Sequence, residues 1–434
     1  MRMKQIGVGL LGFGTVGAGV VDGLCRNREV MSQRLGVDVV LRKIADLDTT
    51  SDRGVKVAPG MLTSDAMSVI HDPEIQIIVE LIGGTTVSRT FILEALNSGK
   101  SVVTANKKLL AEYGQEIFDA AEKNRVDIYF GASVGGGIPI IRVLREGLAG
   151  NEIETIHGIL NGTCNYILTR MENEGAAFDE VLKAAQDAGY AEANPSLDID
   201  GFDTAHKAVI LASLAYGFHV PLNEVRVEGI RNLEGIDVKY AKEFGYRIKL
   251  LAAIRRDGDE IEIGVHPTLV SMNHMLASVN DVFNAAMVHG DLSGDTLYYG
   301  RGAGRAPTAS TVIGDIGDIA RNLSTGIPRY SRAINTVNST KFRIRNADEI
   351  SSKFYVRLMV RDRAGSLGIM TNAFGKHGVS IRAATQKETD EEFPGYVPVV
   401  FLTHRATHAA ITAALAEITR SDVINAEPVL LRVL

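Results

Sequence analysis

A glycine-rich turn near the start of the chain constrains the fold more than any other feature. The apolar run Ile6–Leu11 leads into a GxGxxG turn, and residues 16–24 continue with helical spacing. Between a strand and a helix, such glycines allow a tight turn and a close approach of a pyrophosphate to the helix N-terminus. We expect a Rossmann-type fold whose cofactor-binding turn is Gly12, Phe13, Gly14, Thr15, Val16 and Gly17.

Strand-like and helix-like segments then alternate. Apolar strands are expected at 37–45, 75–82, 101–104 and 126–130, with helices at 88–98 and 109–124 between them. This alternation predicts a parallel sheet in which ligands lie beyond the carboxyl ends of the strands.

Asp46 follows the second expected strand, where Rossmann folds carry an acid for the ribose. A carboxylate there would bind a 2′-hydroxyl and repel a 2′-phosphate, which favours NAD over NADP. Arg53 lies nearby and weakens this preference, and a simple turn residue is the alternative for Asp46.

Three more residues follow strand ends and are candidates for the cofactor site: Gly84, Thr85 and Lys107. A lysine at this edge could meet the nicotinamide or the substrate. The alternative is a solvated lysine beside Lys108.

A later helix places an acid and a base on its apolar stripe. Counted by helical period, Asp203 and Lys207 precede Ile210 and Leu214 on one face. An exposed pair one turn apart would only support the helix. A buried pair costs several kcal/mol per ion, which indicates a functional use.

Composition excludes several classes of protein. The 434 residues are 45% hydrophobic and 23% charged with a net charge of −6, and no basic cluster stands out, so small molecules are expected as partners, not nucleic acid. Cys25 and Cys164 lack CxxC spacing, which argues against a disulfide framework and structural zinc. The first apolar run is too short and glycine-rich for a signal or a membrane anchor, so a cytoplasmic protein is expected.

Five sequence blocks resemble the homoserine dehydrogenase family, nearly end to end. They are Gly12–Gly17, Thr104–Lys108, Gly135–Pro139, Asn161–Leu168, and Gly189–Glu192 together with Asp203 and Lys207. The resemblance implies interconversion of L-homoserine and L-aspartate 4-semialdehyde with NAD or NADP, in threonine and methionine biosynthesis. It implies that Glu192 binds the substrate ammonium, that Asp198 and Asp203 lie in the same pocket, and that Lys207 donates and accepts the proton.

The resemblance also implies further binding residues. Gly162 and Thr163 could bind substrate through their backbone, with a capping turn as the alternative. Gly302 would lie near the cofactor. Family members hold a structural Na⁺ with an acid and backbone carbonyls; the carbonyls would here be those of Val134, Gly136 and Ile138, but the acid position is Gly131.

The C-terminal part resembles an ACT domain, a βαββαβ module that binds amino acids. A strand at 354–360 precedes the turn Arg363–Gly368, whose N–H groups could receive a carboxylate. Threonine is the expected effector, and a chain ending near Ser352 is expected to stay active. A ferredoxin-like module used only for dimerisation is the alternative.

The expected organisation is therefore an α/β chain with three domains and one linker. These are a Rossmann-type dinucleotide-binding domain (1–135 and about 300–325), an inserted α+β substrate and dimerisation domain (136–300), a linker (326–352) and the ACT domain (353–434). Strands at 152–160 and 261–280 would form a mixed sheet that pairs subunits in a homodimer or homotetramer. Two other classes stay open: a related dinucleotide enzyme with another substrate, and a catalytically silent regulator.

Overall fold

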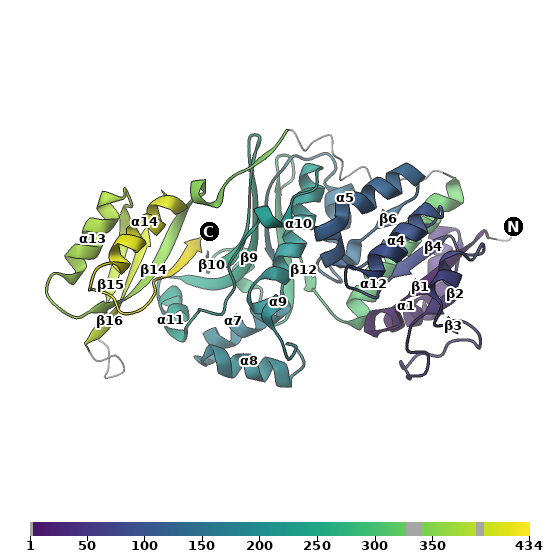
Figure 1. Ribbon diagram of the computed structural model, residues 1–434, viewed down its shortest axis with the longest axis horizontal. Helices are drawn as coiled ribbons and strands as arrows, with labels where there is room; N and C mark the ends of the chain where they lie inside the picture. Colours follow the sequence, from purple (N-terminus) through teal and green to yellow (C-terminus); the bar gives the residue numbers. More distant parts are fainter. Residues whose placement is uncertain (1–2, 327–340, 388–394) are drawn as a thin grey trace. The chain divides into compact units, whose positions relative to one another are not determined.

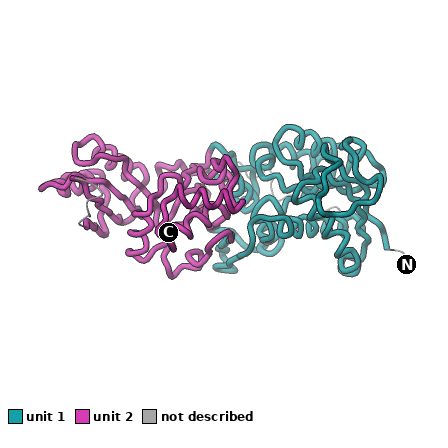
Figure 2. The backbone as a smooth tube through the Cα atoms, turned by 90° about the horizontal axis from the view of Figure 1, so that it is seen from below, with its two compact units in different colours: residues 1–154, 206–223, 284–342 teal, residues 155–205, 224–283, 343–434 magenta. Residues whose placement is uncertain are grey.

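The computed structural model describes residues 3–326, 341–387 and 395–434. These residues form the helices and strands labelled in Figure 1 and divide into two compact units, coloured in Figure 2. The first unit contains residues 1–154, 206–223 and 284–342, and the second contains residues 155–205, 224–283 and 343–434. Helix α10 (Phe202–Tyr216) begins in the second unit and continues in the first. The three-domain boundaries expected from the sequence stay a prediction.

A six-stranded parallel sheet forms the centre of the first unit, with the order β3-β2-β1-β4-β5-β6. This order is the one found in Rossmann folds, and it confirms the fold class. The strands are β1 (Gln5–Leu11), β2 (Asp38–Ala45), β3 (Leu62–Thr63), β4 (Ile77–Glu80), β5 (Ser101–Thr104) and β6 (Ile128–Tyr129).

Helices cover both faces of this sheet. On one face, α1 (Thr15–Arg26), α2 (Arg28–Leu35) and α12 (Arg305–Thr325) contribute to a core with β1 and β4. The close approach of α12 to α1 depends on Gly19, where a Cβ would lie 2.9 Å from Arg305 Cγ. The other helices of the alternating segment are α3 (Ala66–Ile70), α4 (Val87–Asn97) and α5 (Lys107–Asn124). This unit also contains the strand β12 (Gly294–Arg301) and most of β11 (Phe283–Gly290).

A mixed sheet runs through the second unit in the order β7-β9-β10-β18-β14-β16-β15. Its first part contains β7 (Ile153–Ile159), β9 (Tyr246–Asp257) and β10 (Glu260–Ser271), with the short β8 (Arg226–Val227) beside β10. The expected strand at 261–280 is wrong beyond Ser271. The chain turns there, and the His274 side chain accepts a hydrogen bond from Leu276 N–H and caps a short 3₁₀ helix, Met275–Ser278.

Four helices accompany this part of the sheet: α7 (Gly162–Glu174), α8 (Phe178–Asp187), α9 (Ser196–Ile199) and α11 (Gly235–Glu243). Both α7 and α11 contact β9 and each other. Helix α7 begins at Gly162, three residues before the start near Asn165 that the sequence indicates, because Asn161 caps it.

The C-terminal residues fold as β14 (Ser351–Arg361), α13 (Ser366–Lys376), β15 (Ile381–Gln386), β16 (Tyr396–Thr403), α14 (His408–Thr419) and β18 (Val429–Val433). A short strand, β17 (Ala406–Thr407), precedes α14. The βαββαβ order confirms the ACT-like pattern, and the two helices share one apolar core with the sheet. Strand β18 also pairs in parallel with β10, so the ACT sheet continues into the sheet of β7, β9 and β10.

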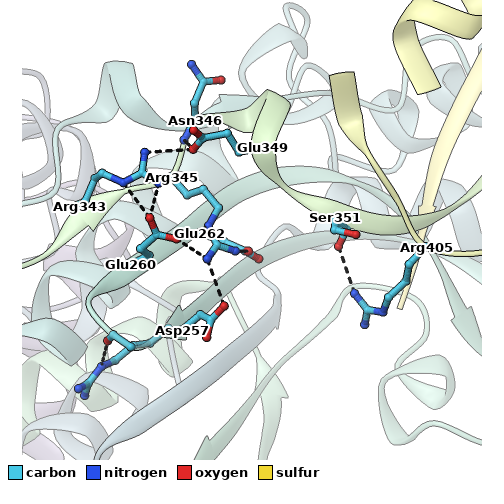
Figure 3. A network of polar contacts seen from close by, with 11 residues as sticks. Asp257, Glu260, Glu262, Arg343, Arg345, Asn346, Glu349, Ser351 and Arg405 are labelled. Atoms are coloured by element: carbon cyan, nitrogen blue, oxygen red, sulfur yellow. Dashed lines mark hydrogen bonds and ion pairs between the residues drawn. The ribbon is translucent and has the colours of Figure 1, made fainter. Parts of the chain in front are cut away.

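An ionic cluster ties the chain to the β9–β10 hairpin just before the ACT domain (Figure 3). Residues 327–340 of the expected linker lie outside the described residues. Beyond them, β13 (Arg343–Ile344) pairs with β10. Arg343 contacts Glu260 and Glu349, and Arg345 contacts Asp257, Glu260 and Glu262. The segment that enters the ACT domain is therefore held along the sheet.

Candidate active site

The glycine turn has the geometry that a dinucleotide needs. Gly12 has φ +97°, and a Cβ there would lie 2.7 Å from the carbonyl carbon of Leu81. A Cβ at Gly17 would lie 2.1 Å from the Gly12 oxygen, whereas no atom lies within 4 Å of a Cβ at Gly14. Gly12 and Gly17 serve the turn and its packing, and Gly14 faces open space at the start of α1. The N-terminus of that helix has no side-chain cap, so its N–H groups could receive a pyrophosphate.

Asp46 lies beside this turn, at the end of β2. Its Oδ2 accepts a hydrogen bond of 2.5 Å from Phe13 N–H, and its Oδ1 accepts one from Asp48 N–H. One oxygen therefore orders the glycine turn. The Arg53 guanidinium is paired with Asp48 at 2.8 Å.

Two residues to which the sequence analysis gave no role hold the loop of Gly84 and Thr85. The fully buried Glu80 accepts hydrogen bonds from Ile82 N–H and Gly83 N–H, and from the Thr104 hydroxyl at 2.7 Å. The Asn106 amide donates to the Gly84 carbonyl at 2.7 Å. In the sequence, only their positions at or just after the ends of β4 and β5 could have marked Glu80 and Asn106 as residues of the cofactor site. Lys107 follows Asn106 as the first residue of α5.

The first turn of α7 organises a cluster of acids in the second unit. Asn161 Nδ2 donates to Asp198 Oδ1 at 2.6 Å and to Asp203 Oδ2 at 2.9 Å. The Cys164 thiol donates to the Asp198 carbonyl, and the Thr163 hydroxyl donates to the Tyr190 carbonyl at 2.7 Å. Asn161 thus caps α7, and the same turn holds the segment from 190 to 198. Substrate binding by Gly162 and Thr163 stays a prediction.

The second asparagine of the block, Asn165, ties α7 to the segment at 279–283. Asn165 Nδ2 donates to the carbonyls of Val279, Asp281 and Phe283, and its Oδ1 accepts from Lys249 Nζ at 3.1 Å. Burial lowers the pKa of Lys249 to about 8. Nothing in the sequence marks Lys249 as a partner of Asn165, because it lies in an apolar strand far along the chain from the block Asn161–Leu168.

The acid and base stripe of α10 is buried, which excludes the alternative of an exposed Asp203 and Lys207 pair. Asp203 and Lys207 are 9% and 8% exposed, and Ile210 and Leu214 are buried on the same stripe. Glu192 is exposed, in the segment between α8 and α9, and its carbonyl accepts a hydrogen bond from Gln186. The structure thus brings Asp198 and Asp203 together through Asn161, and Lys207 follows Asp203 on the same helix, α10.

A glycine-rich turn at 300–304 lies against residues 134–138, where sodium is expected, within the first unit. A Cβ at Gly136 would lie 2.4 Å from the Gly302 oxygen, and a Cβ at Gly302 would lie 2.0 Å from Asn284 Nδ2. These close backbone contacts explain why both positions are glycine.

Two of the three carbonyls expected for sodium accept hydrogen bonds from within the chain, and the structure does not show a sodium site. The Gly136 carbonyl accepts the Thr311 hydroxyl, and the Ile138 carbonyl accepts Ile140 N–H. The carboxylate beside Gly131 belongs to Asp315, which accepts Gly131 N–H at 2.8 Å, and burial raises the pKa of Asp315 to about 7. Within the described residues, no cluster of three or more His, Cys, Asp or Glu side chains could hold a metal ion.

These features define a class of protein: an NAD(P)-dependent oxidoreductase with an acid and lysine site and an ACT domain. Family models for "Homoserine dehydrogenase, NAD binding domain", "Homoserine dehydrogenase" and "ACT domain" match residues 12–131, 139–316 and 354–420. The chain belongs to the homoserine dehydrogenase family.

Relatives and solved structures agree with this assignment. The homoserine dehydrogenase of Neisseria gonorrhoeae is 43% identical over 98% of this chain and 97% of its own, and that of Bacillus subtilis is 38% identical over 98% and 97%. A crystal structure of a homoserine dehydrogenase from Thiobacillus denitrificans matches with a TM-score of 0.93 and 43% identity, covering 100% of this chain and 99% of that one. A hyperthermophilic archaeal homoserine dehydrogenase in complex with NADPH matches with a TM-score of 0.63 and 29% identity, over 75% of this chain and 100% of that one.

Proposed function

We propose that this enzyme interconverts L-homoserine and L-aspartate 4-semialdehyde with Lys207 as the general acid and base. The observation that carries the proposal is the pair of carboxylates, Asp198 and Asp203, held together one helical turn before a buried lysine. The test is NAD(P)H formation with L-homoserine as the substrate.

The chemistry of the substrate matches the residues. NAD(P), when bound, accepts or gives the hydride at the substrate's C4. As hydride leaves C4 of homoserine, the hydroxyl proton must leave as well, and in reverse the alkoxide must gain one. Lys207 serves both directions, and Asp203 holds its ammonium group. Glu192 and Asp198 bind the substrate ammonium.

The two other substrate contacts lie at the start of α7. Gly162 and Thr163 are the first two residues of this helix, whose leading N–H groups lack partners within the helix. We assign them to the substrate carboxylate. Lys107, at the start of α5, is assigned to the nicotinamide or the substrate. No step is assigned to Na⁺ at Val134, Gly136 and Ile138, because these carbonyls lack the acid partner.

Asp46 is expected to make NAD the preferred cofactor. Replacing Asp46 by Ser together with Leu47→Arg should raise the NADP to NAD ratio of kcat/KM by about tenfold or more, because a repulsion of at least about 1 kcal/mol is lost and an attraction is added. Asp46→Asn is the matched control, since it removes the charge but keeps an acceptor for Phe13 N–H. A wild-type preference for NADP would contradict this assignment, and Arg53 would then be the first candidate for the phosphate.

Threonine is the proposed effector, bound at the turn that starts α13. Gly365 caps this helix with φ +92° and no side-chain cap, which leaves N–H groups for a carboxylate. A Cβ at Gly368 or Gly375, both on α13, would meet no atom within 4 Å. Gly368→Glu should therefore abolish threonine inhibition by repulsion, whereas Gly375→Glu should keep it. Calorimetry measures threonine affinity and inhibition curves measure its effect on the rate. If both variants are equally sensitive to threonine, the effector does not bind at this turn.

Assembly and location complete the proposal. As the family resemblance implies, the sheet of β7, β9 and β10 would pair subunits in a homodimer or homotetramer, which sedimentation measures. A cytoplasmic location is proposed from composition. Among the helices in the described part of the chain, none has both the length and the hydropathy to span a bilayer.

A further inference from the structure

Asn161 holds a position that the proposed chemistry has not used. It is 5% exposed and lies between the end of β7 and the first residue of α7. Its Oδ1 accepts a hydrogen bond of 2.8 Å from Cys164 N–H. That bond decides the orientation of the amide, because only the NH₂ group is then left to face the two carboxylates.

The two acids come from different elements, and Asn161 is a partner that they share. Asp198 belongs to the four-residue helix α9, and Asp203 belongs to the first turn of α10. The Asn161 amide donates one hydrogen bond to each, at 2.6 and 2.9 Å. Hydrogen bonds to charged groups are stronger than those between neutral groups, so this bridge has a sizeable effect on where the carboxylates lie.

The bridging group is neutral, and this matters for the ligand. A lysine or arginine at position 161 would hold the acids equally well but would neutralise their charge. An amide holds them and adds no positive charge of its own. Two carboxylates close together repel each other, and a cation between or beside them relieves that repulsion.

We propose that Asn161 is a positioning residue that holds Asp198, which binds the substrate ammonium group, beside Asp203, which holds Lys207. The inference rests on the proposed function, since it needs Asp198 to bind substrate and Asp203 to hold the proton-transferring lysine. The Cys164 thiol adds a second hold on the same element by donating to the Asp198 carbonyl at 3.2 Å.

A purely structural role would be the capping of α7. Serine and aspartate are about as good as asparagine at an N-cap. A capping role therefore predicts that Asn161→Ser and Asn161→Asp behave like the wild type. The positioning role predicts a loss in both, because serine is too short to bridge the acids and aspartate repels them.

The experiment compares these two variants with the wild type in thermal melts, cofactor binding and steady-state kinetics. We expect unchanged cofactor affinity and melting, and a KM for L-homoserine raised about 10- to 100-fold in Asn161→Ser. Asn161→Asp should raise KM at least as much. Asn346→Ser, at the N-cap of a short helix outside the site, is the matched control and should change neither KM nor kcat.

Lys207→Ala, measured in parallel, separates the two ideas. If it loses turnover while both Asn161 variants keep the wild-type KM, the positioning role is overturned and the proposed site stands. If Lys207→Ala keeps turnover, the proposed site itself fails. Should Asn161→Ser melt early, Asn161→Asp carries the test, because it preserves both the cap and the side-chain size.

Discussion

Lys207→Ala is expected to lower kcat by about 10²- to 10⁴-fold, the usual cost of losing a positioned general acid and base. Cofactor affinity should stay near the wild-type value, because Lys207 acts on the substrate oxygen. It lies on α10, whereas the glycine turn of the cofactor site lies between β1 and α1. Stopped-flow or steady-state rates with L-homoserine, together with fluorescence titration of NAD(P)H, measure both quantities.

Lys183→Ala provides the control. This lysine lies on α8, is exposed, and pairs with Asp187 one turn away. Its loss should leave kcat unchanged. A Lys207→Ala enzyme that keeps most of its turnover would remove this lysine from the proton transfer.

Arg357→Ala should destabilise the second unit by about 3–5 kcal/mol. Asp237 on α11 is fully buried, and it accepts hydrogen bonds from Arg357 Nε at 2.7 Å and from the Tyr355 hydroxyl at 2.9 Å. Removing the arginine from β14 leaves a buried charge without its cation, which is the costly way to break such a pair. Chemical denaturation of the full chain, followed by circular dichroism, gives the difference in free energy of unfolding.

Arg363→Ala is the matched comparison within the same domain. Its pair with Asp422 is well exposed, with side chains 42% and 63% accessible, so its loss should cost about 0–1 kcal/mol. If Arg357→Ala costs no more than this control, the ACT domain is not fixed to α11 by the buried pair.

The same contacts change an expectation drawn from the sequence. A separable ACT module suggested that a chain ending near Ser352 would stay active. In the structure, truncation removes β18 from the edge of β10 and leaves Asp237 buried without Arg357. We now expect the truncated chain to be destabilised, and loss of its activity would not by itself report on regulation.

Much of the fold was accessible from the sequence because it depends on local patterns. The glycine turn, the alternating segments and the acid and lysine stripe of α10 are periodic features whose physics is contained in a few consecutive residues. The strand end at Ser271 was missed because residues 272–280 are apolar enough to continue a strand, and a side-chain cap from His274 decides against it.

The contacts that order the site were not accessible in this way. Asn161 contacts Asp198 and Asp203 only after α7, α9 and α10 have packed, and Glu80 contacts Thr104 only once β4 and β5 have paired. Such contacts join residues from 24 to 42 positions apart. A single sequence gives the identity of these residues but does not show that they are in contact.

The initial rate of L-homoserine-dependent NAD and NADP reduction by the purified full chain tests the central claim most directly. The account predicts saturable reduction with L-homoserine, faster with NAD than with NADP at equal concentrations. It also predicts little rate with 4-hydroxybutyrate, which lacks the ammonium group that Asp198 and Glu192 are proposed to bind. No reduction of either cofactor with L-homoserine, or an equal rate with 4-hydroxybutyrate, would contradict it.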